Sequence, residues 1–171
     1  MKKNISGGIR LNLVLFLIVI ALTFIAIQKP GINNHITYKK ISGLTENQIQ
    51  HIEIISSDQK IIQFTKANQK WIIETNENVK DINQDKISYL FNLLNTNSLE
   101  NFPASAEKLS EYHLSNPRIT VKFNDFSIAF GDSEPLKRRR YILIDGQIHL
   151  INDMYYHFLL QPAHTYLVET N

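Results

Sequence analysis

Residues Leu11 to Ile27 form an uninterrupted apolar run, LNLVLFLIVIALTFIAI, which limits what this chain can fold into. The run contains no charged residue, no proline and no glycine, and its only polar residues are Asn12 and Thr23. As an α-helix with a rise of about 1.5 Å per residue, it covers most of a hydrocarbon core of about 30 Å. A helix of a soluble protein normally keeps a polar face, which this run lacks. We therefore expect a transmembrane helix over residues 11–28, which contacts the lipid bilayer through Leu11–Ile27.

The residues before this run predict its orientation. Lys2, Lys3 and Arg10 make residues 1–10 a basic tail, and basic flanks stay on the cytoplasmic side of a membrane. A cleaved signal peptide is one alternative, but its apolar region is about 7–15 residues long and ends at a small-x-small site, which the exit of this run lacks. A type IV pilin-like leader is another, but Leu13 stands where such leaders carry a glutamate. We expect a retained anchor with the rest of the chain outside the cytoplasm.

The composition of the chain predicts one folded domain after the anchor. About 140 of the 171 residues follow the apolar run, which is enough to bury a single core. The net charge is +2, and several of the basic residues flank the anchor, so the domain itself is close to neutral and nucleic acid is not an expected partner. The absence of cysteine excludes disulfides, thiol nucleophiles and cysteine-based zinc sites.

Alternating apolar and polar residues predict strands on both sides of one helix. We expect a linker over residues 29–44, with an extended piece at His35–Tyr38, and a domain over residues 45–171. A stripe at i, i+3, i+4 and i+7 predicts an amphipathic helix over residues 83–96. The expected strands are Ile49–Ile55, Lys60–Lys66, Trp71–Thr75, Ile119–Phe123, Phe126–Phe130, Arg139–Ile144 and Gln147–Ile151.

Turn and cap residues complete this outline. Asp145-Gly146 is a strong two-residue hairpin signal, Gly131-Asp132 is expected to end a strand, and Ser105–Leu109 allows a single helical turn. Asn152 is expected to cap a short helix, Asp153–Leu159, and Thr165–Val168 either adds a strand or frays. The predicted fold class is α+β: an N-terminal transmembrane helix, then a mostly antiparallel β domain with one main amphipathic helix and a short C-terminal helix.

Two surface features are candidate binding sites. The basic run Lys137, Arg138, Arg139 and Arg140 could hold an anionic lipid head group or an acidic partner, or it could be a solvated loop whose charges protect an edge strand. Tyr112, Leu114 and Pro117 form an apolar cluster in a loop. That cluster could be a docking surface for a partner or the plug at one end of the core.

The sequence contains no recognisable catalytic or metal-binding spacing. None of the six histidines has the spacing of a helical zinc motif, although His149, His157 and His164 could converge in the fold. Glu111 could pair with Asp132 or Asp145 as two carboxylates, but Asp145 is already explained by its turn. There is no nucleophile elbow and no phosphate-binding glycine loop. We expect no catalytic, cofactor or metal residue.

The order of several segments resembles a known family. These segments are Lys66 before Trp71-Ile72-Ile73, Leu93-Leu94 on the helix, EYHLSNPRITV at Glu111–Val121, IAFGD at Ile128–Asp132 and RRYILIDGQIHLI at Arg139–Ile151. Over roughly residues 45–165 the chain resembles a bacterial family catalogued as domain of unknown function 4340, in which His113 commonly corresponds to a glycine. The resemblance implies no chemistry. Some members occur beside ABC-transporter components linked to gliding motility, which implies an envelope or transport-accessory role.

Together these observations predict a non-enzymatic, single-pass protein of the bacterial inner membrane. Its amino terminus is expected in the cytoplasm, and its periplasmic domain is expected to bind another cell-envelope protein. The alternative is a lipid- or glycan-binding accessory of an envelope or ABC transport system. An apolar cavity between sheet and helix would favour that alternative.

Overall fold

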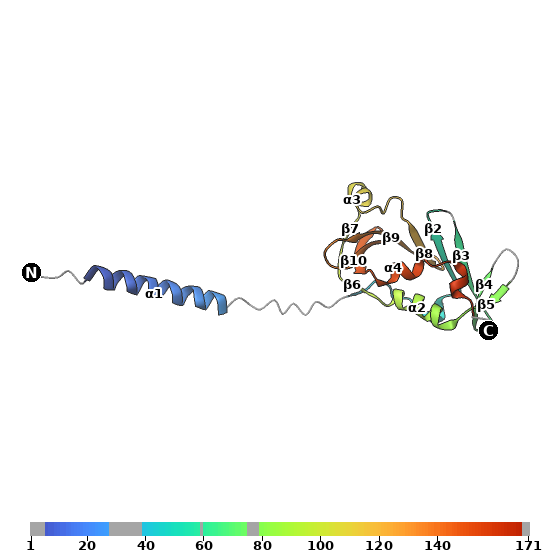
Figure 1. The fold of residues 1–171 in the computed structure, drawn as a ribbon, viewed down its shortest axis with the longest axis horizontal. Helices are drawn as coiled ribbons and strands as arrows, with labels where there is room; N and C mark the ends of the chain where they lie inside the picture. The colour runs from blue at the N-terminus through green and yellow to red at the C-terminus, as the bar shows by residue number, and fades with distance from the viewer. Residues whose placement is uncertain (1–5, 28–38, 59, 75–78, 169–171) are drawn as a thin grey trace, which may run out of the picture. The chain divides into compact units, whose positions relative to one another are not determined.

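The computed structural model describes residues 6–27, 39–58, 60–74 and 79–168, and the chain divides into two compact units, Met1–Thr37 and Tyr38–Asn171. The first unit contains helix α1, Ser6–Ile27 (Figure 1). Its described side chains, those of residues 11–24, are all exposed. Within the part of the chain that the structure describes, no helix combines the length and the apolar character needed to cross a membrane. The expected transmembrane helix over residues 11–28 therefore stays a proposal.

The second unit is an α+β domain built on one nine-stranded sheet, in which every neighbouring pair is antiparallel. The order across the sheet is β5-β4-β3-β2-β8-β9-β10-β11-β7. The strands are β2 (His51–Ser56), β3 (Ile61–Ala67), β4 (Lys70–Glu74), β5 (Val79–Asp81), β7 (Glu100–Pro103), β8 (Ile119–Phe123), β9 (Phe126–Glu134), β10 (Arg139–Ile144) and β11 (Gln147–Asn152). Two short strands, β1 (Lys39–Lys40) and β6 (Asn97–Ser98), pair with each other beside this sheet.

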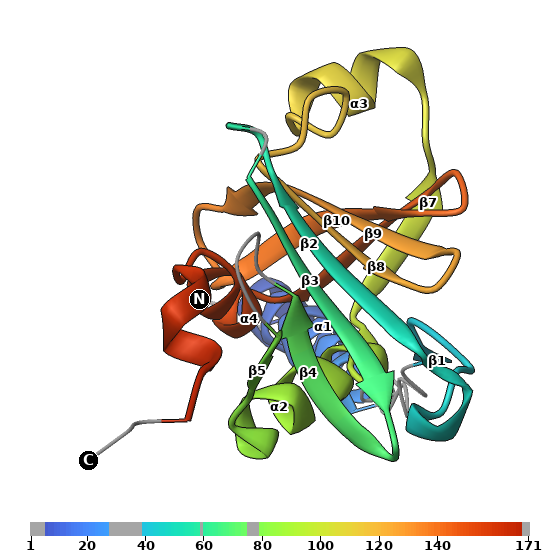
Figure 2. The same cartoon turned by 90° about the vertical axis from the view of Figure 1, so that its right-hand side faces the viewer.

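Helices α2 (Gln84–Leu94) and α4 (Met154–Leu159) cover one face of the sheet, which we call the inner face (Figure 2). The stripe of α2 that the sequence predicts is buried there, and its Phe91 packs against Trp71 of β4 and Phe123 of β8. Tyr156 of α4 packs against Phe130 of β9. The 3₁₀ helices are η1 (Glu46–Gln48) and η2 (Ala163–Tyr166), and the ring of Tyr166 lies against Phe64 of β3.

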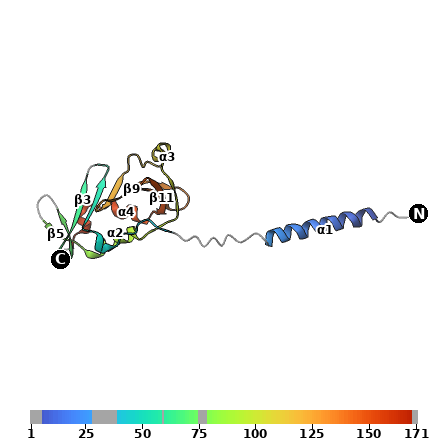
Figure 3. The ribbon, with the colours of Figure 1, turned by 180° about the vertical axis from the view of Figure 1, so that it is seen from behind.

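The chain crosses the sheet twice, once over each face. From β5 at one edge, α2 crosses the inner face to β7 at the opposite edge. From β7, helix α3 (Ala106–Glu111) and the loop after it pass over the outer face and return to β8 in the middle of the sheet. Figure 3 shows the domain from behind, with β3 toward one end and β11 toward the other. The second crossing contacts β10 through Tyr141 and β9 through Gly131, on the outer face.

Helix α3 and the loop after it form what we call the outer cover. This cover is needed because β11 buries apolar side chains on both faces of the sheet. Ile151 lies in the main core, whereas Ile148 and Leu150 are equally buried but belong to the opposite face by their pairing with Leu143 and Tyr141. In the loop after α3, the ring of Tyr112 stacks on the ring of Tyr141. The ring centroids are 3.9 Å apart, and the ring planes are nearly parallel. Leu114, from the same loop, is 3% exposed.

The sequence predicts most of these elements. The amphipathic helix, the short helical turn after Ser105 and the Asp145-Gly146 hairpin are confirmed. Asn83 and Ser105 cap the two helices, and both hairpin residues have positive φ. The predicted cap of α4 is wrong by one residue: Asp153 and not Asn152 occupies the cap position, although Met154 N donates to Asn152 Oδ1. The final segment is mainly η2, with a single bridge from Leu167 to Ile82.

Other expectations differ from the structure. Gly131-Asp132 does not end β9, which continues to Glu134 after a register shift against β10. Strands β5 and β7 were not expected, because each is short and lacks an apolar alternation. Residues 39–44, assigned to the linker by sequence, pack with the domain: β1 pairs with β6, and Ile41 is buried in the core. The extended piece expected at His35–Tyr38 lies outside the described residues.

At Gly131 the outer cover packs directly against the backbone of β9. A Cβ at this position would overlap the carbonyl oxygen of Tyr112 and would lie 2.9 Å from Cγ of Leu114. We expect Gly131→Ala to lower the free energy of unfolding by about 1–3 kcal/mol, because the cover must move away. Urea unfolding of the detergent-solubilised full chain, followed by fluorescence of the single tryptophan, Trp71, measures this change.

Gly43→Ala is the matched control, since a Cβ at Gly43 meets no atom within 4 Å. It should change the unfolding free energy by less than about 0.5 kcal/mol. Equal stability of the two variants would contradict the close packing at Gly131.

Candidate functional site

The structure divides the basic run into one buried residue, Arg140, one half-buried residue, Arg139, and two exposed residues, Lys137 and Arg138. Arg139 donates to Glu134 and to Glu100, and its side chain is 12% exposed. The hydrogen bonds from Arg139 lower the pKa of Glu134. Arg140 is 8% exposed and faces the inner side of the sheet. The guanidinium groups of Arg139 and Arg140 are both occupied within the domain. They are therefore not free to bind an anionic lipid or an acidic partner, although the sequence predicts such a role for the run Lys137–Arg140.

Arg140 is held by three kinds of contact at the junction of β10 with α4. Its guanidinium donates to both carboxylate oxygens of Asp153 and to the carbonyl oxygen of Gly131. Its Cζ lies 3.5 Å from the centroid of the Tyr156 ring, an arrangement typical of a cation–π contact. A buried arginine with this set of partners positions the start of α4 against β9 and β10.

Lys137 and Arg138 remain exposed at the tip of the β9–β10 hairpin. Arg138 has a positive φ of 49°, and its carbonyl oxygen accepts from Asp153 N, so the tip is tied to the start of α4. A pocket of about 400 Å³ lies beside it, lined by Arg138, Asn152, Asp153, Met154 and His157.

The apolar loop cluster lies on the outer face of the sheet. Leu114 is buried, while Tyr112 and Pro117 are half-buried. Burial raises the pKa of the Tyr112 hydroxyl and of Tyr141, on which it is stacked. Next to this cluster, His113 Nδ1 lies 2.7 Å from Asp132 Oδ2. These contacts connect the loop to the domain's own sheet.

The histidines and carboxylates singled out in the sequence are not gathered into a metal site by the described part of the chain. No group of three histidine, aspartate or glutamate side chains there has the arrangement to hold an ion. His149 pairs with Ser98 through Nδ1 at 2.9 Å, and burial lowers the pKa of its imidazole. Asp145 lies in its hairpin turn, and Asp132 pairs with His113.

An open groove of about 800 Å³ lies at one end of the inner face. One side is formed by the end of β2 and the start of β3, and the other by the end of α4 and the residues leading into η2. Its apolar lining comes from Ile61, Ile62, Leu160, Pro162 and Ala163. Ile61 and Leu160 are 56% and 53% exposed, so the groove presents two large apolar side chains to solvent.

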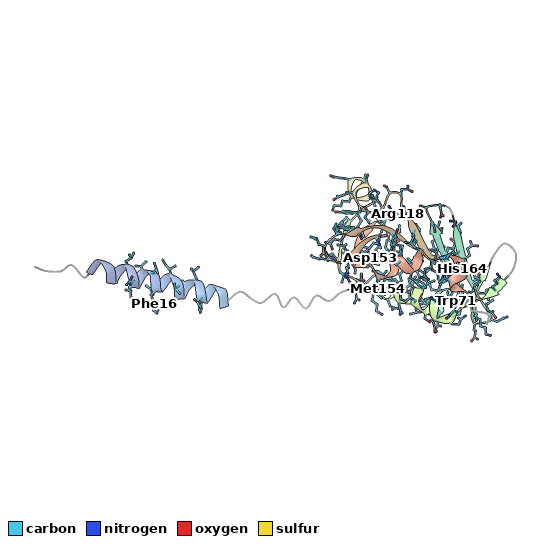
Figure 4. The ribbon with its side chains drawn as sticks, in the orientation of Figure 1. Phe16, Trp71, Arg118, Asp153, Met154 and His164 are labelled. Carbon is cyan, nitrogen blue, oxygen red and sulfur yellow. The ribbon has the colours of Figure 1, made fainter. Side chains whose placement is uncertain are left out.

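Arg118, labelled on the domain in Figure 4, adds a positive charge to the lining of this groove. Asp58 and Lys60 also line it, but they form an ion pair of 2.6 Å with each other, which lowers the pKa of Asp58. Arg118 is exposed and forms no ion pair with an acid among the described residues. It also lines a smaller polar pocket of about 240 Å³ with Ser133, Asp132, Tyr156 and Arg140.

We take the groove and Arg118 together as the candidate functional site. Its size lies within the range of about 300–1,000 Å³ that is typical of sites for small molecules or side-chain anchors. An apolar wall beside one uncompensated cation suits a partner that has an apolar part and a negative charge. Sequence patterns missed the groove, because its walls come from segments more than 50 residues apart that only the sheet order brings together.

Comparisons of the chain with models of known protein families, with curated proteins and with solved structures found no match.

The ion pair of Arg140 with Asp153 fixes the start of α4, the helix whose end lines the groove, and its contribution to stability can be tested. Asp153→Asn should lower the free energy of unfolding by about 3 kcal/mol, because it leaves the charge of Arg140 buried without its counter-ion. Urea unfolding followed by Trp71 fluorescence measures the loss. Asp125→Asn makes the same chemical change at an exposed turn and should alter stability by less than about 0.5 kcal/mol. If both variants unfold alike, Arg140 and Asp153 do not form the pair described.

Proposed function

We propose that the chain is a non-enzymatic, single-pass protein of the bacterial inner membrane whose periplasmic domain binds another cell-envelope protein. The observation that carries the proposal is α1. Its sequence is uncharged from Leu11 to Ile27, and its described side chains are exposed, with values between 48% and 66% for the large apolar ones. Such a surface is costly in water and favourable in lipid.

The length of α1 is consistent with this role. The helix continues through the whole uncharged run, Leu11–Ile27, which at about 1.5 Å per residue covers most of a hydrocarbon core of about 30 Å. Side chains are described for residues 11–24, and the uncharged sequence continues to Ile27. The basic residues Lys2, Lys3 and Arg10 favour a cytoplasmic amino terminus.

The domain contributes a binding surface to the proposal. The groove with Ile61, Leu160 and Arg118 offers an apolar anchor point beside a positive charge. A protein partner could insert an apolar side chain there and place an acidic residue near Arg118, as in the centre of many interfaces. The anchor would raise the effective concentration of the domain near a partner in the same membrane.

The anchor is tested by substitution at its centre. Leu17→Arg combined with Ile20→Arg should release the chain from membranes, because each arginine costs about 3 kcal/mol at the middle of a spanning helix. The measurement is the fraction of full-length chain that stays in the membrane pellet after an alkaline carbonate wash. Leu17→Ala combined with Ile20→Ala keeps the helix uncharged and should remain in the pellet. A wild-type chain that washes off would contradict the proposal.

The second candidate function is binding of a lipid or glycan as an accessory of an envelope or ABC transport system. The apolar groove between the end of the sheet and α4 favours it. A lipid with a negatively charged head group would place its chain along Ile61 and Leu160 and its charge near Arg118.

One experiment separates the two candidates. A photo-crosslinking residue at Ile61 in cells should give a protein adduct if the groove binds an envelope protein. If the groove binds a lipid, mass spectrometry of the purified full chain should show a bound lipid that Leu160→Asp removes. Val168 is 55% exposed and outside the groove, so the crosslinker at Val168 and Val168→Asp are the matched controls. Identical results at the groove and at Val168 would remove the groove as a site.

A further inference from the structure

We propose that the tip of the β9–β10 hairpin, together with the exposed side of α4, is a surface that docks on an anionic lipid bilayer. The surface consists of Leu136, Lys137, Arg138, Met154 and His157, and we call it the tip surface. The inference rests on the proposed membrane anchor, because it concerns how the anchored domain lies on its own membrane. It assigns to the bilayer a set of residues that differs from the basic run recognised in the sequence.

The apolar part of the tip surface is unusually exposed. Leu136 is 91% exposed, the highest value among the large apolar side chains described, and Met154 is 53% exposed. Met154 and His157 are three residues apart on α4, so they share one side of that helix. Two apolar side chains that protrude beside cations are typical of surfaces that enter the boundary between head groups and acyl chains.

The charge of the tip surface is positive because the neighbouring acids are already paired. Glu134, at the base of the hairpin, pairs with Arg139, and Asp153 pairs with Arg140. Lys137 and Arg138 are exposed and form no ion pair with an acid in the described ranges. The two cations are therefore free to meet lipid phosphates, and each Lys or Arg near an anionic surface strengthens binding about fivefold.

The tip is held in place before any lipid binds. Asp153 N donates to the carbonyl oxygen of Arg138 at 3.0 Å, which ties the tip to α4. The ion pair of Arg139 with Glu134 closes the base of the hairpin. A preorganised surface loses little conformational entropy on docking, so two apolar side chains and two cations can be sufficient.

The tether makes a bilayer the favoured occupant. Residues 28–38 separate α1 from β1, and eleven residues span at most about 40 Å when fully extended. A domain held so close to a membrane meets lipid at high effective concentration, so contacts that are weak individually become significant. Lipid phosphates match the two cations, and the acyl boundary matches Leu136 and Met154.

The absence of cysteine makes the test direct. The full chain carrying Leu136→Cys is labelled with an environment-sensitive fluorophore and reconstituted in nanodiscs. One set contains phosphatidylcholine alone, and the other contains phosphatidylcholine mixed with phosphatidylglycerol. We expect blue-shifted emission at position 136, quenched by brominated acyl chains, in the anionic nanodiscs. Asp125→Cys labels the β8–β9 hairpin tip, which has no exposed large apolar residue among those described, and should give the same spectrum in both sets.

Charge reversal completes the test. Adding Lys137→Glu and Arg138→Glu to the labelled chain should abolish the lipid-dependent shift, whereas Lys122→Glu, on a different part of the sheet, should not. The proposal is overturned if position 136 behaves like position 125, or if its shift is the same in both lipid mixtures. Co-elution of the chain with the nanodisc is measured separately. A chain that co-elutes without an emission shift contradicts the docking proposal alone. A chain that does not co-elute contradicts the membrane anchor, and with it this inference.

Discussion

The domain depends on covering a sheet whose β11 end is apolar on both faces. Ile151 of β11 points into the main core, and Ile148 and Leu150 are buried on the other side. Such a strand is stable only if the chain supplies a layer to each face. The path of the chain does so: α2 and α4 cover the inner face, and α3 with its following loop covers the outer one. Gly131 and the pair of Arg140 with Asp153 lie where these layers meet the same strands.

The candidate binding surfaces lie where this covering ends. The end of α4 and the start of η2 stop short of the β2–β3 end of the sheet, which leaves the groove with Arg118. The start of α4 is tied to the β9–β10 tip, which leaves Leu136 and Arg138 exposed beside Met154. Helix α4 therefore lines both surfaces. This arrangement supports a domain that lies on a membrane at one place and receives a partner or lipid at another, which is the account proposed for this chain.

The sequence predicts the elements that a local residue pattern determines. It does not predict the features that depend on which strands pair across the sheet. The stripe of α2, the Asp145-Gly146 turn and the alternation of β8 are local, and all three are found. Strand β7 has no pattern of its own and forms because β11 offers it an edge. The role of Arg140 could not be predicted from four consecutive basic residues, since it depends on a register shift opposite Gly131 and on Asp153 thirteen residues away. Ile61 and Leu160 line the same groove, but they are far apart in the sequence, and no sequence pattern predicts that they lie close together.

The central claim is that α1 crosses the membrane and that the domain faces away from the cytoplasm. Thiol labelling in intact cells tests it most directly, because the chain has no cysteine of its own. Asn124→Cys, in an exposed turn of the domain, should react with a membrane-impermeant maleimide that enters the periplasm, while Lys3→Cys should react only after the cells are lysed. Labelling of Lys3→Cys and protection of Asn124→Cys in intact cells would contradict the account, as would protection of both with full-length chain in the soluble fraction.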